Sequence, residues 1–590
     1  MDFFSILTMF GGLALFLYGM ETMGSGLSRL SGGKLERILE KLTDNPIKAV
    51  LLGAGVTAVI QSSSATTVMV VGFVNSGIMK LGQAVGIIMG ANVGTTITSW
   101  ILSLSGIDSS NFFIRLLKPS SFSPVLAMMG VCLLLFSKKE KKKDLGLIFV
   151  GFAILMTGMD TMSGAVKPLA EIPEFANILT MFSNPLLGML CGVLLTAVLQ
   201  SSSASIGILQ ALCATGAVTF GTALPIIMGQ NIGTCITAIL SGIGAHKNAK
   251  RTALVHLYFN LIGTIIFMVV FYTLHVFLQF AFMEQPTGAV GIAVVHSAFN
   301  IAATIVLLPF SKLLVTLAYL TIPETIEERE EFDEKTQDLE LLDIRFLETP
   351  GYALKQSKTV AVQMALLSQK ALLKAMALLE NYEEKQVKKV LRLEERVDHY
   401  EDELGSYLVR LGSKKLSEQE SYQVSMLLHC IGDFERISDH AVNIVETAEE
   451  LHEKKATFSK KAKEELQVFT DALCEIVSLM VEAFTNEDME KARAVEPLEE
   501  TMDDLSKKLK KRHVERLKSG ECTIMLGFAL SDLVTNYERI SDHCSNIAIA
   551  LLQSQSDGYE VHEYVTELQK EENPEFQRAY LAFREKYRLP

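Results

Sequence analysis

The sequence predicts an all-α polytopic membrane protein with a soluble helical domain at its C-terminal end. Apolar stretches fill the chain up to about Pro323, and several reach the ~20 residues that a helix needs to cross a bilayer. After that point charged residues recur every few positions, so no segment there suits lipid. A long internal repeat within the apolar part sets the architecture of the membrane domain.

Composition limits the function classes. The 590 residues carry a formal net charge of −13, mostly from the C-terminal part, which argues against a nucleic-acid partner. Eight cysteines lie scattered without a CxxC spacing, which argues against structural disulfides or a zinc site. The N-terminus has no basic segment and no small-residue cleavage site, so we interpret the first apolar stretch as a permanent span and expect a plasma-membrane protein.

The membrane part is duplicated at an offset of 139 residues without gaps. Thr57–Ala65 recurs as Thr196–Ala204, and Ile87–Thr95 recurs as Ile226–Thr234. In each copy Gln-Ser-Ser-Ser is followed at a fixed distance by Gly-x-Asn-x-Gly-Thr. A constant register over this length indicates two copies of one membrane unit. We assign them to residues 1–139 and 140–322, the second copy with extra C-terminal spans.

The polar run 61–67 lies within an apolar stretch from about Pro46 to Met79, which is much longer than one span. A re-entrant helical hairpin fits this length better, with the polar run at an unwound tip. Irregular backbone at that depth is tolerated only if it lines a cavity. The tips of the two copies are therefore the candidate binding site.

Counting spans predicts inverted repeats. If each hairpin makes no net crossing, the first copy has three spans, and the second copy enters the membrane from the opposite side. With the N-terminus outside, the basic run Lys138 to Lys143 and Lys250 lie in the cytoplasm, as does the C-terminal domain, whereas Arg115 and Lys118 do not fit. The predicted spans are 4–28, 82–104, 112–137, 145–167, 222–243, 252–283 and 288–320.

The tips combine two kinds of binding chemistry. Hydroxyls, a carboxamide and helix N-termini suit an oxyanion. Oxygen atoms of Ser, Thr and Asn are hard ligands of the type that hold a small cation such as sodium. The alternative is that Ser, Gly and Thr only permit close helix packing. Duplication of the glutamine together with the serines favours binding.

Other polar residues in the spans leave alternatives open. Glu21 and Asp160 are equivalent acids in the two copies, and they either take part in cation or proton movement or lie near span ends in contact with solvent. His256 and His296 belong to a second short duplication. We expect them to form hydrogen bonds between spans rather than to relay protons.

The paired motifs resemble the type II sodium/phosphate cotransporter family over essentially residues 1–320. The resemblance implies sodium-coupled movement of inorganic phosphate, with both tips lining one shared site. Carried over by position, the substrate-binding candidates are Gln61, Ser62, Ser63, Ser64, Gln200, Ser201, Ser202 and Ser203. The sodium-binding candidates are Thr66, Asn92, Thr95, Ser205, Asn231 and Thr234.

From about Pro350, apolar residues recur at helical spacing among charges. This predicts an all-helical cytoplasmic domain over 350–590, after an acidic, aperiodic linker at 323–349. The sequence Tyr/Phe-Glu-Arg-Ile-Ser-Asp-His-x-x-Asn begins at Phe434 and again at Tyr537, so this domain is also duplicated. Two three-helix bundles, roughly 351–455 and 457–555, account for its length.

Glu-x-x-x-Asp pairs occur twice in each predicted bundle, and a spacing of four puts both carboxylates on one helix face. Such pairs on facing helices hold metal ions in helical di-iron bundles. A solvated acidic face or a structural arginine network is the alternative. The metal-binding candidates are Glu394, Asp398, Glu435, Asp439, Glu499, Asp503, Glu538 and Asp542.

This C-terminal part resembles the PhoU-like phosphate-signalling domains. The resemblance implies a regulatory module that binds a divalent or iron-type metal and reports phosphate status to a protein partner. The leading hypothesis is a sodium-coupled phosphate symporter that works by alternating access in the lipid bilayer, with no catalytic activity. The alternatives are a phosphate exporter, a proton-coupled anion transporter, and a phosphate-sensing membrane receptor without net transport.

Overall fold

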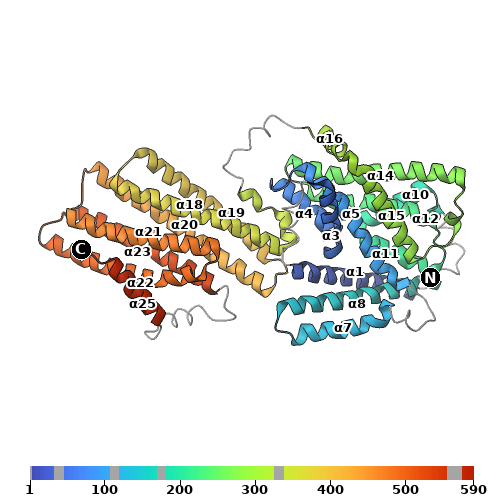
Figure 1. The fold of residues 1–590 in the computed structure, drawn as a ribbon, viewed down its shortest axis with the longest axis horizontal. Coiled ribbons are helices and arrows are strands. Elements are labelled where there is room, and N and C mark those ends of the chain that lie inside the picture. Colours follow the sequence, from blue (N-terminus) through green and yellow to red (C-terminus); the bar gives the residue numbers. More distant parts are fainter. Residues whose placement is uncertain (1–2, 32–44, 107–117, 169–180, 324–337, 554–573) are drawn as a thin grey trace. The chain divides into compact units, whose positions relative to one another are not determined.

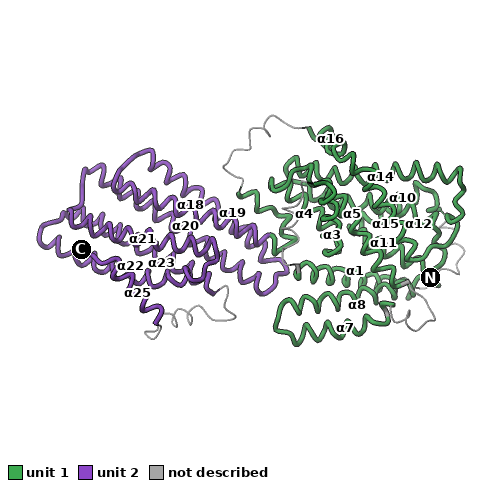
Figure 2. Tube along the Cα trace, viewed as in Figure 1, with its two compact units in different colours: residues 1–352 green, residues 353–590 purple. Residues whose placement is uncertain are grey.

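The computed structural model describes residues 3–31, 45–106, 118–168, 181–323, 338–553 and 574–590. Within these ranges the regular elements are helices, apart from one isolated antiparallel bridge between Thr219 and Pro286 (Figure 1). The chain divides into two compact units, Met1–Tyr352 and Ala353–Pro590 (Figure 2). The prediction of an all-helical chain with a separate C-terminal part is confirmed.

Both membrane copies have the same order of helices in unit 1. In each copy a long helix is followed by two half-helices. The next helix carries the Gly-x-Asn-x-Gly-Thr motif, and further helices come after it. The first copy has α1 (Phe3–Ser31), α3 (Pro46–Ile60), α4 (Ser63–Asn75), α5 (Leu81–Ser103) and α7 (Pro119–Phe136). The second copy and its extension have α8 (Glu140–Val166), α10 (Pro185–Leu199), α11 (Ser202–Leu212), α12 (Phe220–Gly233), α13 (Cys235–Ser241), α14 (Lys247–Leu278), α15 (Ala289–Leu307) and α16 (Ser311–Thr321).

Most of the predicted spans coincide with helices of sufficient length. Among the described residues of unit 1, the helical segments long and apolar enough to cross a membrane are Phe4–Leu30, Leu81–Ser103, Glu140–Val166, Phe220–Ser241, Lys247–Leu278 and Ala289–Thr321. The predicted span 112–137 corresponds to α7, which begins at Pro119. Arg115 lies outside the described residues, so the start of that span stays a prediction.

One further helix, α18 (Pro350–Glu380), also reaches the length and mean hydropathy of a span. It carries lysines at 355, 358, 370 and 374, and its Gln369 donates a hydrogen bond to Ser478 of the C-terminal unit. These polar contacts suit a helix within a soluble bundle, as the sequence predicts for this segment.

Two equivalent long helices, α1 and α8, cross where glycines face each other. A Cβ at Gly19 would lie 2.2 Å from the backbone nitrogen of Leu155, and one at Gly158 would lie 2.3 Å from the backbone nitrogen of Phe16. Gly12 and Gly151 occupy the same crossing, where an added Cβ would lie 2.8 and 2.4 Å, respectively, from backbone atoms of the other helix. Small residues allow this approach in a membrane, where no hydrophobic force between helices exists.

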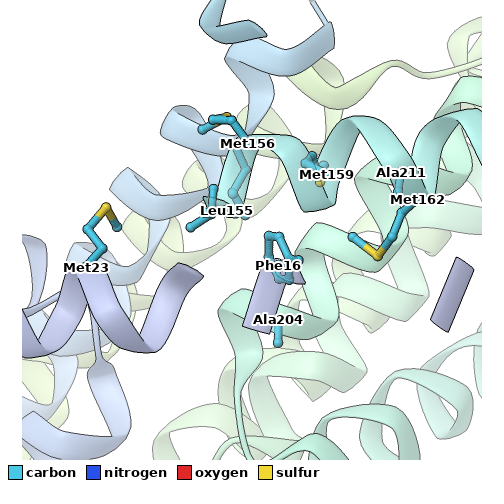
Figure 3. Packing of buried hydrophobic residues seen from close by; sticks show 9 residues of the cluster. Phe16, Met23, Leu155, Met156, Met159, Met162, Ala204 and Ala211 are labelled. Atoms are coloured by element: carbon cyan, nitrogen blue, oxygen red, sulfur yellow. The ribbon is translucent and has the colours of Figure 1, made fainter. Parts of the chain in front are cut away.

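An apolar cluster surrounds this crossing (Figure 3). It includes Phe16 and Met23 of α1 together with Met159 and Met162 of α8, all nearly inaccessible to solvent. The ring of Phe16 also lies against α11, because a Cβ at Gly207 would be 2.5 Å from its Cζ atom. The crossing therefore supports the second arm of the second hairpin directly.

The C-terminal unit contains two successive groups of three long helices, which match the predicted bundle boundaries. The first group is α18, α19 (Glu384–Gly412) and α20 (Glu418–Glu453); the second is α21 (Lys460–Asn486), α22 (Met489–Lys518) and α23 (Ile524–Gln553). The first group ends close to residue 455 and the second close to residue 555, where the sequence predicts the ends of the two bundles. A further helix, α25 (Pro574–Lys586), packs on α22, and Tyr580 donates a 3.0 Å hydrogen bond to Asp504.

The linker predicted at 323–349 is described from residue 338, and that part packs on unit 1 instead of only connecting two domains. It forms a short 3-10 helix, η7 (Ile344–Glu348), in which Arg345, Phe346 and Leu347 are buried. The sequence interpretation missed this packing because so short a turn has no helical periodicity to read.

We predict that Gly19→Ala and Gly158→Ala each lower the thermal stability of the detergent-solubilised protein. An added methyl must push the helices apart, and overpacking of this kind costs about 1–3 kcal/mol. Thermal unfolding followed by size-exclusion chromatography measures the loss. Gly11→Ala and Gly164→Ala are matched controls on the same two helices, since a Cβ at either position would have nothing within 4 Å. Equal stability of all four variants would contradict the proposed role of the crossing.

Candidate functional site

The helix breaks predicted at the two polar runs are present and equivalent. Gln61 lies between α3 and α4, and Gln200 lies between α10 and α11, with left-handed φ values of 61° and 53°. Each glutamine N–H donates to the carbonyl of a threonine one turn back, Thr57 or Thr196, at 2.8 Å. A left-handed residue other than glycine costs about 1–3 kcal/mol, so the surrounding structure specifies this conformation.

The next residue in each copy begins a helix. Ser62 is the N-cap of α4 and its Oγ accepts a 3.1 Å hydrogen bond from the N–H of Ala65. Ser201 does the same for α11 through Ala204 at 3.2 Å. The first N–H groups of a helix have no partner within it, and the helix dipole is positive there. Both tips therefore present groups that suit an anion.

The two tips differ in their hydrogen bonds. Gln61 is only 8% exposed, its amide group donates to the carbonyl of Ala58, and its Oε1 accepts a 3.0 Å bond from Thr98 of α5. Gln200 is exposed. The first tip is thus held closed against α5, while the side chain of the second faces outward.

A second difference lies beneath the tips. In the first copy the hydroxyl of Thr57 donates to that of Thr66 at 3.0 Å. The equivalent residues of the second copy, Thr196 and Ser205, are buried, and their hydroxyls have no partner among the described residues. Buried hydroxyls without partners are costly, so these two residues are a candidate place for an ion or water.

The hairpins contact helices of the opposite copy. Thr237 of α13 donates a 3.4 Å hydrogen bond to Ser64 at the start of α4. Gln210 of α11 donates to the backbone carbonyls of Ser99 in α5 and Ala289 in α15, both at 3.0 Å. The second arm of each hairpin, α4 or α11, therefore forms hydrogen bonds with the opposite copy.

The remaining sodium-binding candidates use their donors inside their own helices. The amides of Asn92 and Asn231 donate at 2.9 Å to carbonyls four residues back. The hydroxyls of Thr95 and Thr234 do likewise at 2.9 Å, and Thr66 donates to Ser62 at 3.1 Å. The hydroxyl of Thr66 also accepts the bond from Thr57, but each of these side-chain oxygen atoms keeps a lone pair that can bind a cation.

Sequence reasoning missed Gln230. This side chain is fully buried in α12, and neither its amide nitrogen nor its oxygen has a partner among the described residues. Gly233, one turn further along α12, lies against Thr196, because a Cβ at Gly233 would be 2.8 Å from the threonine Cβ. Aligning the two copies offers a signal, because the first copy has Ala91 at the position of Gln230.

Of the two buried histidines, His296 forms the hydrogen bond between spans that the sequence predicts. His296 of α15 forms a 2.7 Å hydrogen bond with Ser99 of α5 and so joins two spans. The backbone carbonyl of His256 accepts from Cys235 at 3.5 Å. Glu21 is exposed and Asp160 is half-buried, which leaves both interpretations of those acids open.

In the C-terminal unit, Glu499, Asp503 and Asp542 bring one carboxylate oxygen each within 4.8 Å of one another. Burial and the neighbouring carboxylates, first Glu496, raise the pKa of Glu499 to about 8. Three oxygen ligands in a partly buried place fit a hard divalent cation. The fourth candidate, Glu538, instead accepts hydrogen bonds from Ser506 at 2.6 Å and Lys510 at 2.7 Å.

The four candidates of the first bundle are also electrostatic neighbours. Burial and the adjacent Asp439 raise the pKa of Glu435 to about 7. Burial, followed by Asp439 and Asp398, raises the pKa of Glu394. Among the described residues, however, only the trio at Glu499 brings three ligand atoms this close.

Comparison with known sequences assigns both parts of the chain. The profile of the Na+/Pi-cotransporter family matches residues 15–164 and 158–286, so each match covers most of one membrane copy, and the first also extends into the start of the second copy. The chain belongs to this family. The PhoU domain profile matches residues 361–448 and 469–551, one match within each helical bundle. The predicted duplication of both parts is therefore confirmed.

Three relatives in this family differ in how much of the chain they share. YjbB of Escherichia coli (strain K12), named for inorganic phosphate export, is 24% identical over 95% of this chain and 100% of its own length. The uncharacterized protein YqeW of Bacillus subtilis (strain 168) is 32% identical over 54% of this chain and 99% of its own. Sodium-dependent phosphate transport protein 2A of Rattus norvegicus is 27% identical over 29% of this chain and 26% of its own.

We predict that Glu499→Gln stabilises the metal-free protein at about pH 8 and not at about pH 5. The raised pKa means that the folded chain holds this proton at pH values where the unfolded chain has released it, so folding stability falls as pH rises towards 8. A glutamine at position 499 cannot ionise, so the variant does not lose this folding stability as the pH rises. Thermal unfolding in the presence of a chelator measures the difference from the parent at each pH.

Glu515→Gln is the matched control, because Glu515 is an exposed acid on the same helix. The stability difference between this control and the parent should not depend on pH. If the stability difference between Glu499→Gln and the parent is also independent of pH, the raised pKa of Glu499 is contradicted.

Proposed function

We propose that the protein moves inorganic phosphate across the membrane with sodium as the coupling ion, by alternating access between two inverted repeats. The observation that carries this proposal is the pair of helix breaks at Gln61 and Gln200, each followed by a helix N-terminus. Membership of the Na+/Pi-cotransporter family supports phosphate as the cargo.

The composition of the tips supports coupling to a cation. The candidate substrate ligands are neutral: glutamines, serines and backbone N–H groups. Two helix N-termini supply together about one elementary positive charge, which does not balance a divalent phosphate in a low-dielectric site. Cations that enter together with phosphate offset the remaining charge. Neutral ligands therefore favour cotransport over binding of phosphate alone.

The second copy offers a place for such a cation. Thr196, Ser205 and Gln230 hold buried oxygen atoms without partners among the described residues. Neutral oxygen ligands are those that hold sodium at broken helices in transporters. The equivalent positions of the first copy are satisfied by the Thr57–Thr66 hydrogen bond and by Ala91, so the two copies would not bind the cation equally.

The unequal tips fit one end state of alternating access. Gln61 is closed against Thr98, while Gln200 is exposed. In a pair of inverted repeats, exchange of the two conformations opens the site to the other side of the membrane. Residue Thr237 aligns with Thr98, and it would exchange its contact with Ser64 for the equivalent role towards Gln200 in the other end state.

Export of phosphate is the second candidate, because YjbB matches this chain over nearly its whole length, the PhoU region included. An inward sodium gradient drives uptake, so export would depend on the phosphate gradient or on another coupling ion. Assays in both directions separate the two candidates.

We predict that proteoliposomes take up radiolabelled phosphate in response to a sodium gradient, and that Gln61→Ala and Gln200→Ala each reduce uptake about tenfold or more. Losing a hydrogen bond to a charged ligand costs about 1.5–3 kcal/mol, which corresponds to this factor. Gln279→Ala is the control, because Gln279 has the same left-handed backbone but ends α14.

Uptake that is indifferent to sodium and to both tip substitutions would rule out the proposed mechanism. Vesicles loaded with phosphate test the second candidate. Efflux from these vesicles down the phosphate gradient without a sodium requirement would support export. Binding of phosphate without flux in either direction would support a receptor.

We predict that Gln230→Ala raises the sodium concentration for half-maximal uptake about fivefold or more, because one cation ligand is lost. The phosphate KM at saturating sodium should stay unchanged. Thr304→Val is the control, since Thr304 of α15 is also buried without a hydroxyl partner in the described part of the chain. A sodium dependence that equals the parent's would exclude Gln230 as a ligand.

A further inference from the structure

The segment directly before the C-terminal unit contains a buried ion pair. Nη1 of Arg345 lies 2.5 Å from Oδ2 of Asp343, and these side chains are 8% and 1% exposed. Oδ1 of Asp343 also accepts a 2.8 Å hydrogen bond from the N–H of Arg345. A buried pair gains little stability over apolar residues of the same size, so a role in holding other groups in place accounts for it better than stability does.

The acid of this pair holds the end of the first hairpin. Asn75 is the last residue of α4, and its Nδ2 donates a 2.7 Å hydrogen bond to Oδ2 of Asp343. Oδ1 of Asn75 accepts a 2.9 Å bond from the N–H of His246, which precedes α14. Asp343 is therefore attached to α4 and, through Asn75, to the start of α14.

The base of the pair holds a helix of the other copy. Nε of Arg345 donates a 2.9 Å hydrogen bond to the carbonyl of Ser241, the last residue of α13. A cation at a helix C-terminus is also favoured by the helix dipole. Together Asp343 and Arg345, the connector ion pair, tie the C-terminal end of α4 in one copy to that of α13 in the other.

Aromatic packing strengthens the attachment to α4. The ring of Phe346 lies 5.4 Å from that of Phe73, and Tyr352 lies 5.2 Å from Phe73 and 4.9 Å from Phe346. Gly72 makes room for this, because a Cβ there would be 2.8 Å from Cε1 of Phe346. Only the first copy has these residues. At the positions of Gly72, Phe73 and Asn75 the second copy has Ala211, Leu212 and Ala214.

The same two helices also meet at their other ends. Ser64 in the first turn of α4 accepts a hydrogen bond from Thr237 of α13 at 3.4 Å. The 13 residues of α4 span about 20 Å as a continuous helix, so a shift at Asn75 is felt at Ser64. Parting α4 from α13 requires that the connector ion pair releases one of them.

We propose that Asp343 and Arg345 are positioning residues for the first tip, and that the connector ion pair controls whether α4 can separate from α13. Helix α18 begins at Pro350 and continues past Tyr352 into the C-terminal unit. Through this segment the C-terminal unit is linked to the first tip, at Gln61, and not to the second tip, at Gln200. This inference rests on the proposed function for its effect on transport, but not for its effect on the tip itself.

The test places a reporter cysteine in the first turn of α4 by Ala65→Cys and follows its labelling by a thiol reagent in the full-length protein. Asp343→Asn with Arg345→Met removes both charges and leaves neither buried alone. We expect this double variant to label about fivefold faster or more, because hydrogen bonds that hold α4 are lost. Asn75→Ala, which copies the second repeat, should have the same effect in a less altered chain.

Two controls make the readout specific. Ala204→Cys lies at the equivalent position of the second hairpin, and its labelling should not respond to the connector variants. Glu384→Gln with Lys388→Met removes an exposed ion pair of the C-terminal unit and should leave residue 65 unaffected. Thermal unfolding of each variant shows whether it is folded, and rates are corrected for labelling of the native cysteines.

Phosphate uptake is the second readout. We expect the double variant to change the phosphate KM by about threefold or more with less change in maximal rate, and Arg345→Lys to fall between variant and parent. Faster labelling in a chain that moves no phosphate would sustain the inference and defeat the proposed function. If residue 65 is labelled at the parent's rate in both the double variant and Asn75→Ala, the inference is overturned, whatever the phosphate uptake.

Discussion

The close crossing of α1 and α8 is the constraint on which the membrane part depends. At this crossing the two copies touch through glycines, with backbone approaching backbone too closely for any side chain. Helices in lipid gain nothing from hiding apolar surface from each other, so van der Waals contact at short distance must hold them. The crossing also seats Phe16 against Gly207 of α11 and thereby fixes one hairpin relative to the other copy.

The hairpin tips show how a broken helix keeps its backbone groups satisfied at a candidate binding site. A chain that unwinds within a membrane must satisfy its backbone groups, and here the left-handed glutamines and the serine N-caps do so. Sequence symmetry does not extend to hydrogen bonding. Thr98 engages Gln61, whereas Thr196, Ser205 and Gln230 are left with unused oxygen atoms among the described residues. Two similar copies thus supply different chemistry to one transporter.

Two charged features lie within the C-terminal part and in the segment directly before it. Burial, followed by the charges of Glu496 and of the other two acids of the trio, raises the pKa of Glu499 to about 8, and a bound cation would favour the ionised carboxylate instead. The connector before the C-terminal part has a buried ion pair attached to α4 and α13. The chain continues from this ion pair into α18, and hydrogen bonds and ring contacts join the same segment to α4 at residues that the second copy lacks.

The sequence alone determined the duplication, the positions of both helix breaks and the carboxylate pairs, because each is a local pattern of spacing and composition. It did not determine which pairs form. Asn75 meets Asp343 across 268 residues, Gln230 is buried without a partner among the described residues, and Glu538 binds Lys510 instead of joining the acidic trio. Such outcomes depend on which helices pack together and how closely, and only the tertiary structure decides that. The repeated Gln-Ser-Ser-Ser motif predicts where the candidate site lies, while folding makes the two tips unequal.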